Sequence, residues 1–524
     1  MTEEIAQHKS QFSIITPVFN PSREAFEECV KSVLTQTYAD WQWCLVDDHS
    51  SHGWVQQRLS DLQALDPRIR VHFREVNGGI VAASNDALSL ASGEFVALLD
   101  HDDALHPEAL EKVQEVLLGG TDIDYVYTDE DKVGPDGMFY DRFNKPKWSP
   151  ERLLAQNYCS HLSVIRKRLV DEVGRFRDGF DGSQDYDLFL RITEKARKIA
   201  HIPEVLYHWR AVSGSTAHAQ SEKPYAYAAA VRAVNAALER REISATVSMT
   251  EPWPYQRVLR SLAYEPKISI IIPTCGTYKT IFGVETCLVI NSVESILTRS
   301  AYKNFDVLVV IDDSTPPGVW DGLRAIADNR LQLLRYDKPF NFASKCNLGA
   351  VMSTGEYLLM LNDDTEITDE RWLHTLAGYL EEQDVAMVGP MLLLEDGRIQ
   401  SAGHANNPSP HNFRTGLSAN LPGEFGVLSI ARECSGITGA CALIRKSVYN
   451  EVGGMSPMFP RAFNDVDLGF KILQAGYRII WTPHTRVYHF ETASRPKGVE
   501  QEEVELLLER WQSKFNADEY CRLE

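Results

Sequence analysis

The sequence predicts an α/β protein made of two tandem domains, each with a doubly wound, mostly parallel sheet. The chain has 524 residues, whereas single domains usually run to about 100–250 residues. A strand-like run near the start, FSIITPVFN, is matched by ISIIIPT 256 residues later, counted from Ser13 to Ser269. After each run, short apolar segments alternate with helix-like segments, a pattern typical of parallel sheets covered by helices.

The predicted elements of the two halves recur in the same order. A helix follows the first strand, at residues 26–35 and 287–297. The second strand ends in WCLVDDHS or VLVVIDDS, and the third is IRVHFRE or LQLLRY. A loop and helix containing an asparagine come next, and then a strand that leads into LLDHDD or MLNDDT. Ligands of such sheets bind beyond the carboxyl ends of the strands, so we expect one site in each half.

We place the two domains at residues 1–250 and 251–524. The alanine-rich stretch PYAYAAAVRAVNAALERR, residues 224–241, predicts a helix at the end of the first domain. A less regular stretch with Pro252, Pro254 and Pro266 follows and marks the boundary. Residues 499–515 have helical periodicity, and we expect this helix to pack on the second domain.

Composition narrows the class of partner and the compartment. With 53 basic and 73 acidic residues the net charge is −20, which argues against a nucleic-acid partner because phosphate binding needs clustered Lys and Arg. A local basic patch would still allow peripheral contact with a membrane. We find no apolar run of about 18–20 residues, no secretion signal at the polar start and no C-x-x-C pair among nine cysteines. We therefore expect a cytoplasmic protein.

Acidic clusters follow the same predicted strand in both halves. Residues 100–103 read DHDD and residues 362–364 read NDD. Hard divalent cations prefer carboxylate oxygens, and an ion held by one or two carboxylates keeps positions open for a substrate phosphate. A single cluster of this kind is more often a solvated turn than a metal site. Its repetition, 54 residues after Asp48 and 51 residues after Asp313 when counted to Asp102 and Asp364, favours a metal site.

Two further pairs of aspartates recur. Asp48 and Asp313 end the second predicted strand, where each is either a turn or cap residue or an acceptor for the imide N–H of a uracil or thymine base. Asp185 and Asp465 open a probable helix. The helix N-terminus favours an ionised carboxylate that can take a proton, although helix capping explains an aspartate there equally well.

A histidine recurs after each of these helices. His208 lies 23 residues after Asp185, and His489 lies 24 residues after Asp465, each after a short predicted strand. A lone histidine is more often a packing or surface residue than a ligand. The matched spacing favours the interpretation that both are metal ligands.

Taken together, these motifs resemble glycosyltransferase family 2, inverting enzymes with the GT-A fold. The resemblance covers residues 11–216 and 267–495, and within the family both halves look like bacterial O-antigen and cell-surface polysaccharide transferases, the second like a rhamnosyltransferase. In the first half it rests on TPVFN, VDDHSS, the Asn85 loop, LLDHDD, SQDYDL and LYHWR. In the second half it rests on IIPT, IDDS, NFASKCN, LNDDT, TGACALIRK, NDVDL and YHFETASR.

The resemblance implies a role for each matching residue. It makes Asp185 and Asp465 the general bases. It places the metal at Asp102 and His208 in the first half and at Asp364 and His489 in the second. It assigns the remaining residues to nucleotide-sugar binding: Pro17, Asp48, Asn85, Asp100, Pro273, Asp313, Asn347 and Asp363. The chain departs from the family pattern at Asn362, which removes one charge, and at Gln184 and Asn464, where the family often has Glu.

The implied activity is that of a bifunctional inverting glycosyltransferase that needs Mn²⁺ or Mg²⁺. The implied donors are UDP- or dTDP-sugars, with dTDP-rhamnose for the second domain, and the implied acceptor is a glycan or lipid-linked glycan at the inner face of the plasma membrane. One alternative is a single active domain beside a glycan- or nucleotide-binding domain. A nucleotidyltransferase also uses paired aspartates and a metal, but TPVFNPSRE is not a basic, glycine-rich loop. A non-catalytic carbohydrate-binding protein would not need two acidic clusters.

Overall fold

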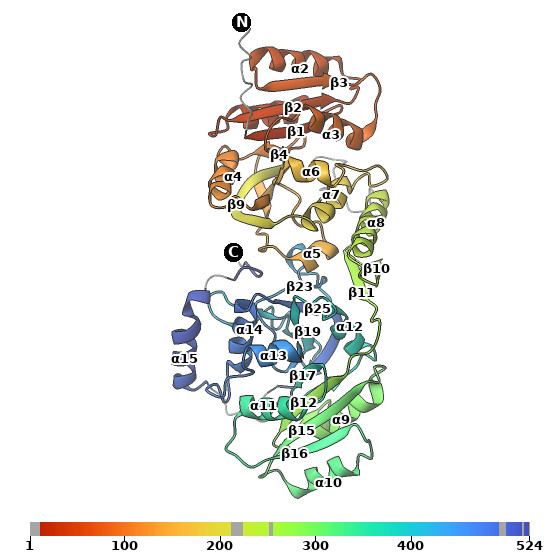
Figure 1. Ribbon diagram of the computed structural model, residues 1–524, viewed down its shortest axis with the longest axis vertical. Helices are drawn as coiled ribbons and strands as arrows, with labels where there is room; N and C mark the ends of the chain where they lie inside the picture. Colours follow the sequence, from red (N-terminus) through yellow and green to blue (C-terminus); the bar gives the residue numbers. More distant parts are fainter. Residues whose placement is uncertain (1–10, 211–223, 251–254, 492–498, 516–517, 523–524) are drawn as a thin grey trace. The chain divides into compact units, whose positions relative to one another are not determined.

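The computed structural model describes residues 11–210, 224–250, 255–491, 499–515 and 518–522. Two compact units make up the chain (Figure 1). The first unit contains the described residues up to 148 together with 156–242, and the second contains 149–155 and the described residues from 243 onward. The short segment 149–155 therefore belongs to the second unit, although it lies within the sequence of the first.

One mixed sheet forms the first unit, in the order β3-β2-β1-β4-β8-β6-β9-β5, with β7 paired to β6. The four strands β1 to β4 run parallel, as the apolar β-branched runs predict, whereas β8 is antiparallel to both β4 and β6. The strands are β1 Phe12–Val18, β2 Trp41–Asp47, β3 Ile69–Phe73, β4 Phe95–Leu98, β5 Ala104–Leu105, β6 Ile123–Val133, β7 Phe139–Phe143, β8 Ser163–Arg166 and β9 Lys198–Arg210.

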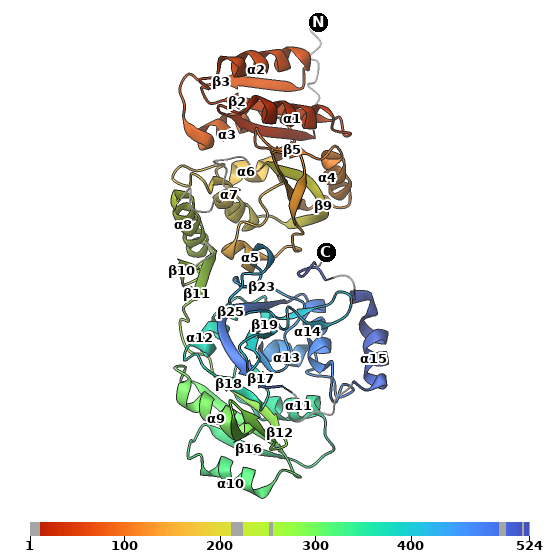
Figure 2. The ribbon, with the colours of Figure 1, turned by 180° about the vertical axis from the view of Figure 1, so that it is seen from behind.

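Helices cover both faces of this sheet. Figure 1 shows α3 in front of the sheet, and Figure 2, seen from behind, shows α1 on the other face. Apolar side chains of α1, α2 and α4 share one buried cluster with the strands, for example Phe26 with Ile14 and Trp43. The helices are α1 Arg23–Leu34, α2 Gly53–Leu65, α3 Gly79–Leu90, α4 Ala109–Leu118, α6 Lys167–Glu172, α7 Gln184–Thr193 and α8 Pro224–Arg240.

The second unit repeats this strand order as β16-β15-β12-β17-β24-β19-β25-β18, with β20 on β19 and β23 on β25. The repeat and the α/β class that the sequence predicts are therefore confirmed. The strands are β12 Ile268–Thr274, β15 Phe305–Asp312, β16 Leu331–Tyr336, β17 Tyr357–Leu361, β18 Thr365–Ile367, β19 Val385–Leu393, β20 Ile399–Ser401, β23 Arg432–Glu433, β24 Cys441–Arg445 and β25 Arg478–His489.

Helices also pack on the two faces of the second sheet, and separate apolar clusters form beneath them. Residues of α9, α10 and α12 enter one cluster, and residues of α11, α13 and α14 enter the other. The helices are α5 Pro150–Ala155, α9 Leu288–Arg299, α10 Pro317–Ala325, α11 Phe342–Met352, α12 Trp372–Tyr379, α13 Lys446–Glu451, α14 Asn464–Gln474 and α15 Gln501–Trp511, with 3-10 turns at Glu424–Gly426 and Gln512–Lys514.

Three small hairpins complete the second unit, and one of them corrects the sequence analysis. The stretch predicted to be irregular contains β11 Gln256–Arg260, which pairs with β10 Ala245–Met249. The other hairpins join β13 Tyr278–Ile281 to β14 Val284–Cys287, and β21 His404–Ala405 to β22 His411–Asn412. Alternating exposure along β10 and β11 is what a two-stranded ribbon covered on one face requires.

The C-terminal helix packs on the second unit, as its periodicity predicts. Trp511 of α15 stacks near Phe470 of α14, with ring centroids 5.2 Å apart. Leu507 and Phe459 lie in the same cluster. The Trp511 indole N–H donates to Asp467 at 3.0 Å. The helix therefore packs through an apolar stripe and through an indole N–H that has a hydrogen-bond acceptor.

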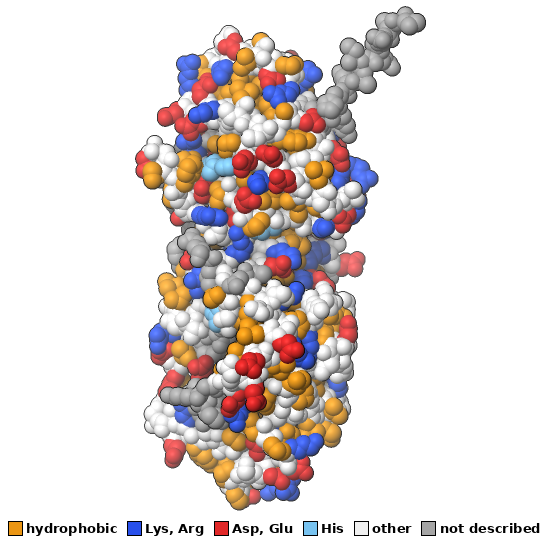
Figure 3. All heavy atoms as spheres, turned by 90° about the vertical axis from the view of Figure 1, so that its left-hand side faces the viewer, with side chains coloured by type: hydrophobic (Ala, Val, Ile, Leu, Met, Phe, Trp, Pro, Cys, Tyr) orange, Lys and Arg blue, Asp and Glu red, His pale blue; other side chains and the backbone are white. Residues whose placement is uncertain are grey.

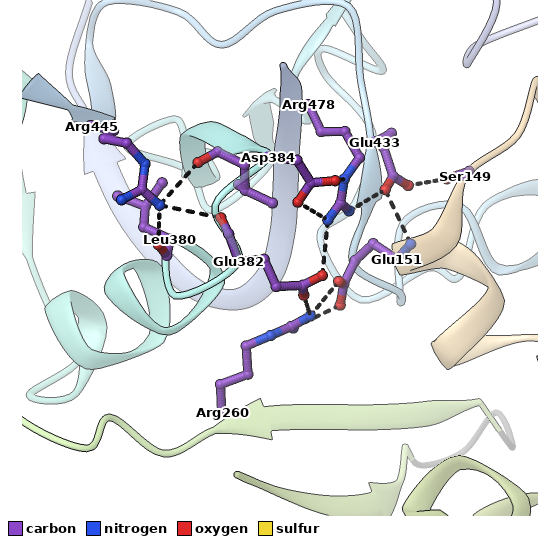
Figure 4. Close-up of polar contacts among 10 residues, drawn as sticks. Ser149, Glu151, Arg260, Leu380, Glu382, Asp384, Glu433, Arg445 and Arg478 are labelled. Carbon is purple, nitrogen blue, oxygen red and sulfur yellow. Dashed lines mark hydrogen bonds and ion pairs between the residues drawn. The ribbon is translucent and has the colours of Figure 1, made fainter. Parts of the chain in front are cut away.

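A buried network of charges binds the segment 149–155 to the rest of the second unit (Figure 4). Arg260 of β11 donates to both carboxylate oxygens of Glu151, at 2.9 and 2.6 Å, and also pairs with Glu382. Arg478 of β25 continues the network to Glu382 and to Glu433, at 2.9 Å each. Glu433 accepts the backbone N–H of Glu151 at 3.1 Å, which closes the ring of contacts.

Because these charges alternate in sign and are almost fully enclosed, each depends on the others. The side chains of Arg260 and Glu151 are 2% and 3% exposed. Removing one partner of a buried ion pair leaves an uncompensated charge, which is far more costly than losing a surface pair. The network therefore fixes where α5 lies on the second unit.

Within the described part of the chain, no helix combines the length and the apolar character that a membrane crossing requires.

The Arg260→Leu substitution tests the buried network. It leaves Glu151 and Glu382 without their shared cation, and we expect it to lower the free energy of unfolding of the second unit by about 3–5 kcal/mol. The unfolding transition in urea, followed by tryptophan fluorescence, measures this change. The matched control is Arg324→Leu, which removes an exposed pair with Asp321 and should cost about 0–1 kcal/mol. Equal effects of the two substitutions would show that the network contributes no more than a surface pair.

Candidate functional site

The carboxyl ends of β1, β2 and β4 meet at one edge of the first sheet. Parallel pairing places Val18 beside Asp47, and Ile15 beside Leu98. Asp48 follows directly after β2, and Asp100 lies two residues after the end of β4, although the two are distant in sequence. A cavity of about 370 Å³ lies at this edge, lined by Pro17, Val18, Phe19, Asp48, Asn77, Gly79, Ile80, Ala83, Asp100, His101 and Asp102. Four predicted site residues, Pro17, Asp48, Asp100 and Asp102, are thus brought together.

Asp48 forms part of the wall of this cavity and fixes the loop beside it. Its carboxylate accepts the backbone N–H groups of Gly78 and Gly79 at 2.8 Å each and pairs with Arg74 at 2.9 Å. Those N–H groups belong to the start of α3, where a carboxylate is favoured by the helix N-terminus. Base recognition by Asp48 stays a prediction, because both of its oxygens already have partners.

A second cavity adjoins the first and contains the predicted base. It shares Pro17, Ile80 and Asp100 with the first cavity, and its lining includes Asp185 and His161. Asp185 lies in the first turn of α7, as the sequence predicts. Its Oδ2 accepts the amide of Asn157 at 2.9 Å. This carboxylate therefore faces Asp100 across a space next to the larger cavity.

Charge is crowded at the end of β4. Burial raises the pKa of Asp100, and Asp102 and Asp185 raise it further, whereas His161 lowers it. Burial also raises the pKa of Asp103 well above its ordinary value, and Asp102 and Asp100 add to that rise. Asp103 accepts the Tyr207 hydroxyl at 2.6 Å and the backbone N–H of Arg210 at 2.7 Å. So many carboxylates in one place favour a bound cation.

Asp100, Asp103 and His161 form a group that fits a divalent cation. One ligand atom from each lies within 4.8 Å of the others. Carboxylate oxygens suit Mg²⁺ and Mn²⁺, and an imidazole nitrogen is a ligand for transition metals. The sequence analysis did not select His161, because no copy of it recurs at a matching distance in the second half.

A buried lysine sets the position of His161. Lys145 is fully buried, and its ammonium donates to Glu130 at 2.9 Å, to the carbonyl of Cys159 at 3.0 Å and to the carbonyl of His161. Glu130 in turn accepts the backbone N–H of His161 at 3.2 Å. The imidazole stacks on Tyr207, with centroids 4.6 Å apart. These contacts hold the loop that carries His161 against the acidic cluster.

His208 contacts Asp131 in this structure, so its role beside Asp102 at a metal stays a prediction. Its Nδ1 is 2.7 Å from Asp131 Oδ1, and its ring lies 4.5 Å from that of Phe139. The cause is strand register. His208 pairs with Ala104, two residues after Asp102, whereas His489 pairs with Thr365, one residue after Asp364. A shift of one residue turns a side chain to the other face of a strand.

In the second unit the predicted metal pair does come together. His489 is the last residue of β25, and its Nε2 lies 3.1 Å from Asp364 Oδ1. The amide of Asn362 is 3.2 Å from the same nitrogen. A carboxylate and an imidazole at this distance are suitable first ligands for a divalent cation.

The neighbouring Asp363 is buried and carries a strongly shifted pKa. Burial raises its pKa to about 7, and Asp364 contributes to the rise. Thr274, directly after Pro273 at the end of β12, donates its hydroxyl to Asp363 at 2.6 Å. Asp313, by contrast, lies near the surface, where its Oδ2 is 3.0 Å from Arg335 Nη2. A direct contact between Asp313 and a base stays a prediction.

In the second unit, a buried lysine side chain lies at the carboxyl edge of the sheet. Lys345 of α11 is 1% exposed, with its ammonium 2.7 Å from Asp312 and 3.1 Å from the carbonyl of Thr274. Counted from Asn85 and Asn347, Lys345 occupies the position of Ala83, which lines the cavity of the first unit. The carboxyl edges of the two sheets therefore differ in charge at this position.

Asp465 lies in the first turn of α14, as the sequence predicts. Its Oδ2 accepts the backbone N–H of Gly439 at 2.9 Å, and its Oδ1 accepts the N–H of Val466 at 2.9 Å. The Nε2 of His404 is 4.0 Å from Oδ2. The same helix position thus presents a carboxylate in both units.

The side chains of Asn85 and Asn347 bond to backbone groups, and their nucleotide contact stays a prediction. The amide of Asn85 donates to the carbonyl of Phe176 at 3.0 Å and accepts its N–H at 3.2 Å. Asn347 forms the same pair of bonds with Met455, at 2.8 and 3.1 Å. Both side chains are occupied by a backbone segment, so they fix the loop before the helix that carries the base.

Comparison with known proteins gives the same assignment to both halves. The model for glycosyl transferase family 2 matches residues 13–174 and again residues 269–453. The uncharacterized protein y4gI of Sinorhizobium fredii is 37% identical over 98% of this chain. The O-antigen biosynthesis protein RfbC of Myxococcus xanthus is 35% identical over 92% of the chain. The chain spans 57% of the length of the first relative and 37% of the second.

Solved structures are also similar. Residues 1–349 of TarS from S. aureus, in complex with UDP-GlcNAc, match with a TM-score of 0.37 and 22% identity. The match covers 44% of this chain and 66% of that chain.

The raised pKa of Asp363 predicts how stability depends on pH. In the metal-free protein, the folded second unit holds this proton up to about pH 7, whereas an unfolded aspartate loses it near pH 4. The stability that it contributes is therefore complete below about pH 4 and is lost as pH rises to about 7, at about 1.4 kcal/mol per unit of pKa difference. Urea unfolding in EDTA at several pH values should show this fall, and Asp363→Asn should reduce it. An unchanged slope in Asp363→Asn would contradict the prediction.

Two histidine substitutions distinguish the possible metal ligands of the first unit. In an Asp364→Asn background, which weakens the second unit's metal pair, we expect His161→Ala to weaken Mn²⁺ affinity about tenfold or more, because it removes one of the three grouped donors. His208→Ala should change affinity little. Electron paramagnetic resonance of free Mn²⁺ during titration measures both. The reverse result would restore His208 as the ligand.

Proposed function

Because the chain belongs to glycosyltransferase family 2, we propose that it is a bifunctional inverting transferase that takes sugars from nucleotide-diphosphate donors. Each unit would hold one active site, with domains at residues 1–250 and 251–524. Asp185 would be the general base of the first and Asp465 of the second.

The observation that carries this proposal is the position of Asp185. It faces Asp100 in a cavity that adjoins the larger one between Asp48 and Asp102. A donor whose nucleotide fills the larger cavity would direct its sugar into the smaller one, next to the Asp185 carboxylate. A base placed beside the anomeric carbon, with the diphosphate on the other side, is the geometry that an inverting displacement requires.

The proposed reaction is a single in-line displacement. Asp185 or Asp465 accepts the proton of an acceptor hydroxyl as the acceptor oxygen bonds to the anomeric carbon. The bond from that carbon to the phosphate oxygen breaks, and the nucleoside diphosphate leaves with the electron pair. Base catalysis of this kind contributes about 10²–10⁴-fold.

The residues present fit a divalent cation, Mn²⁺ or Mg²⁺. Asp100, Asp103 and His161 would hold it in the first unit, with Asp102 at the edge of the nucleotide cavity, and Asp364 and His489 would hold it in the second. When bound, the cation offsets the charge that builds on the leaving diphosphate. The protein's own part is to keep these donors fixed, through Lys145 and Tyr207 in the first unit.

We propose UDP- or dTDP-sugars as donors, with dTDP-rhamnose for the second unit, and a glycan or lipid-linked glycan as acceptor. The relationship to an O-antigen biosynthesis protein supports a role in bacterial surface polysaccharide synthesis. Such an acceptor would bring the chain into peripheral contact with the inner face of the plasma membrane.

A second candidate function is that only the first unit transfers sugar and the second binds a glycan or a nucleotide. The second site is less acidic than the first, which favours this second candidate function. The buried Lys345 stands where the first unit has Ala83, and the amide of Asn362 stands where the first unit has Asp100.

Single substitutions of the proposed bases test both candidates. Nucleotide release from a panel of UDP-, dTDP- and GDP-sugars with Mn²⁺ and a glycan extract is measured for wild type, Asp185→Asn and Asp465→Asn. We expect each substitution to lower turnover of a different donor or linkage at least 10²-fold, because it removes the base and keeps the shape. If Asp465→Asn leaves the turnover of every donor unchanged, the second candidate function holds. If wild type releases no nucleotide, the proposed function is wrong.

A further inference from the structure

A histidine that none of the motifs includes lies beside the carboxylate of Asp465. His404 comes from β21, which lies between β20 and β22 and well away from α14 in sequence. Its Nε2 is 4.0 Å from Asp465 Oδ2, the oxygen that also accepts the N–H of Gly439 at 2.9 Å. The proposed base of the second unit thus has an imidazole on one side and a backbone N–H on the other.

The imidazole is held in place by its surroundings. His404 is 5% exposed, and its backbone N–H donates to the carbonyl of Gly436 at 2.8 Å. Gly436 also leaves the space that the ring occupies, since a Cβ at that position would lie 2.8 Å from His404 Nδ1. The ring is therefore fixed by a glycine next to the loop that supplies the Gly439 N–H.

One ring nitrogen of His404 lacks, among the described residues, the hydrogen-bond partner that a buried histidine normally has. Among the residues that the structure describes, none forms a hydrogen bond with His404 Nδ1. Buried polar side-chain atoms in native proteins are usually satisfied, and an exception calls for an explanation. A functional need for the ring beside Asp465 provides one.

We propose that His404 is a positioning residue for Asp465, and that its imidazole N–H directs the carboxylate at the acceptor hydroxyl. This proposal rests on the proposed function of the second unit. The separation of 4.0 Å is longer than a hydrogen bond, and catalytic hydrogen bonds are often long in unliganded structures and shorten when substrate binds.

In the first unit, a different side chain donates a hydrogen bond to the proposed base. There the amide of Asn157 donates to Asp185 Oδ2 at 2.9 Å. A neutral N–H donor stabilises the charged form of a carboxylate. Asn157 therefore indicates which substitution of His404 should preserve the function.

The electrostatics around His404 favour the neutral ring. Burial lowers the pKa of His404, and His411 lowers it further, whereas Asp465 and Asp518 raise it. These groups come from β22, from α14 and from the C-terminal segment, so they surround the ring on the elements packed against it. A neutral imidazole has one N–H to donate, and Asp465 is the carboxylate within reach.

The substitutions His404→Phe and His404→Asn test the proposal. Each is made in the full chain that also carries Asp185→Asn, so that only the second unit is expected to turn over a donor. Nucleotide release from the UDP- and dTDP-sugar panel is followed from pH 5 to 9. We expect His404→Phe to lower kcat about tenfold or more with little change in the donor KM, and to move the acidic limb of the kcat profile to higher pH, because the base loses the donor that stabilises its charged form. His404→Asn should restore most of kcat and the wild-type profile.

The controls separate this proposal from the one on which it rests. Thermal unfolding of each variant, together with first-unit turnover in the Asp465→Asn background, shows whether the fold is intact. His411→Asn, in the same hairpin, should leave the profile unchanged. If Asp465→Asn stops turnover but His404→Phe keeps kcat and the profile of wild type, His404 is only structural. If His404→Asn behaves like His404→Phe despite an intact fold, the N–H donor role is wrong. If no donor is turned over, the proposed function fails, and the role of His404 fails with it.

Discussion

Both candidate sites depend on the parallel order β2-β1-β4 and on its copy β15-β12-β17. Parallel strands end at a common edge, so side chains that follow different strands meet there. This geometry places Asp48 and Asp100 around one cavity, and it also forces carboxylates together against their mutual repulsion. The raised pKa values of Asp100 and Asp103 follow from this crowding and from burial. The edge is thus suited to a cation and to the phosphates that a cation binds.

Buried charge also shapes the second unit away from its site. The network around Arg260 and Arg478 holds α5, a segment that lies within the sequence of the first unit. Such a network contributes less to stability than an apolar contact of the same size, but it tolerates few alternative arrangements. It specifies where the segment binds. On the face drawn in Figure 3, acidic side chains also gather beside a histidine in the first unit. These side chains are exposed to solvent, which stabilises their charge.

The two units use one scaffold and differ in the chemistry at its edge. Asn157 supports one proposed base, whereas Gly439 and His404 surround the other. A buried lysine, Lys345, stands where the first unit has Ala83. Differences of this kind set the chemistry of each site, because specificity resides in the side chains at a site and not in the fold.

The sequence by itself determined the parallel strands that recur in both halves, their order and the helix starts that carry Asp185 and Asp465, because these follow from local periodicity and from the repeat. Only the tertiary structure decided which histidines reach the acidic clusters. The same YH pair occurs in both halves, yet His489 contacts Asp364 and His208 contacts Asp131. Side chains alternate along a strand, so a register shift of one residue, set by long-range pairing, reverses the direction of the ring. His161 likewise reaches its cluster through a buried lysine that no local pattern reveals.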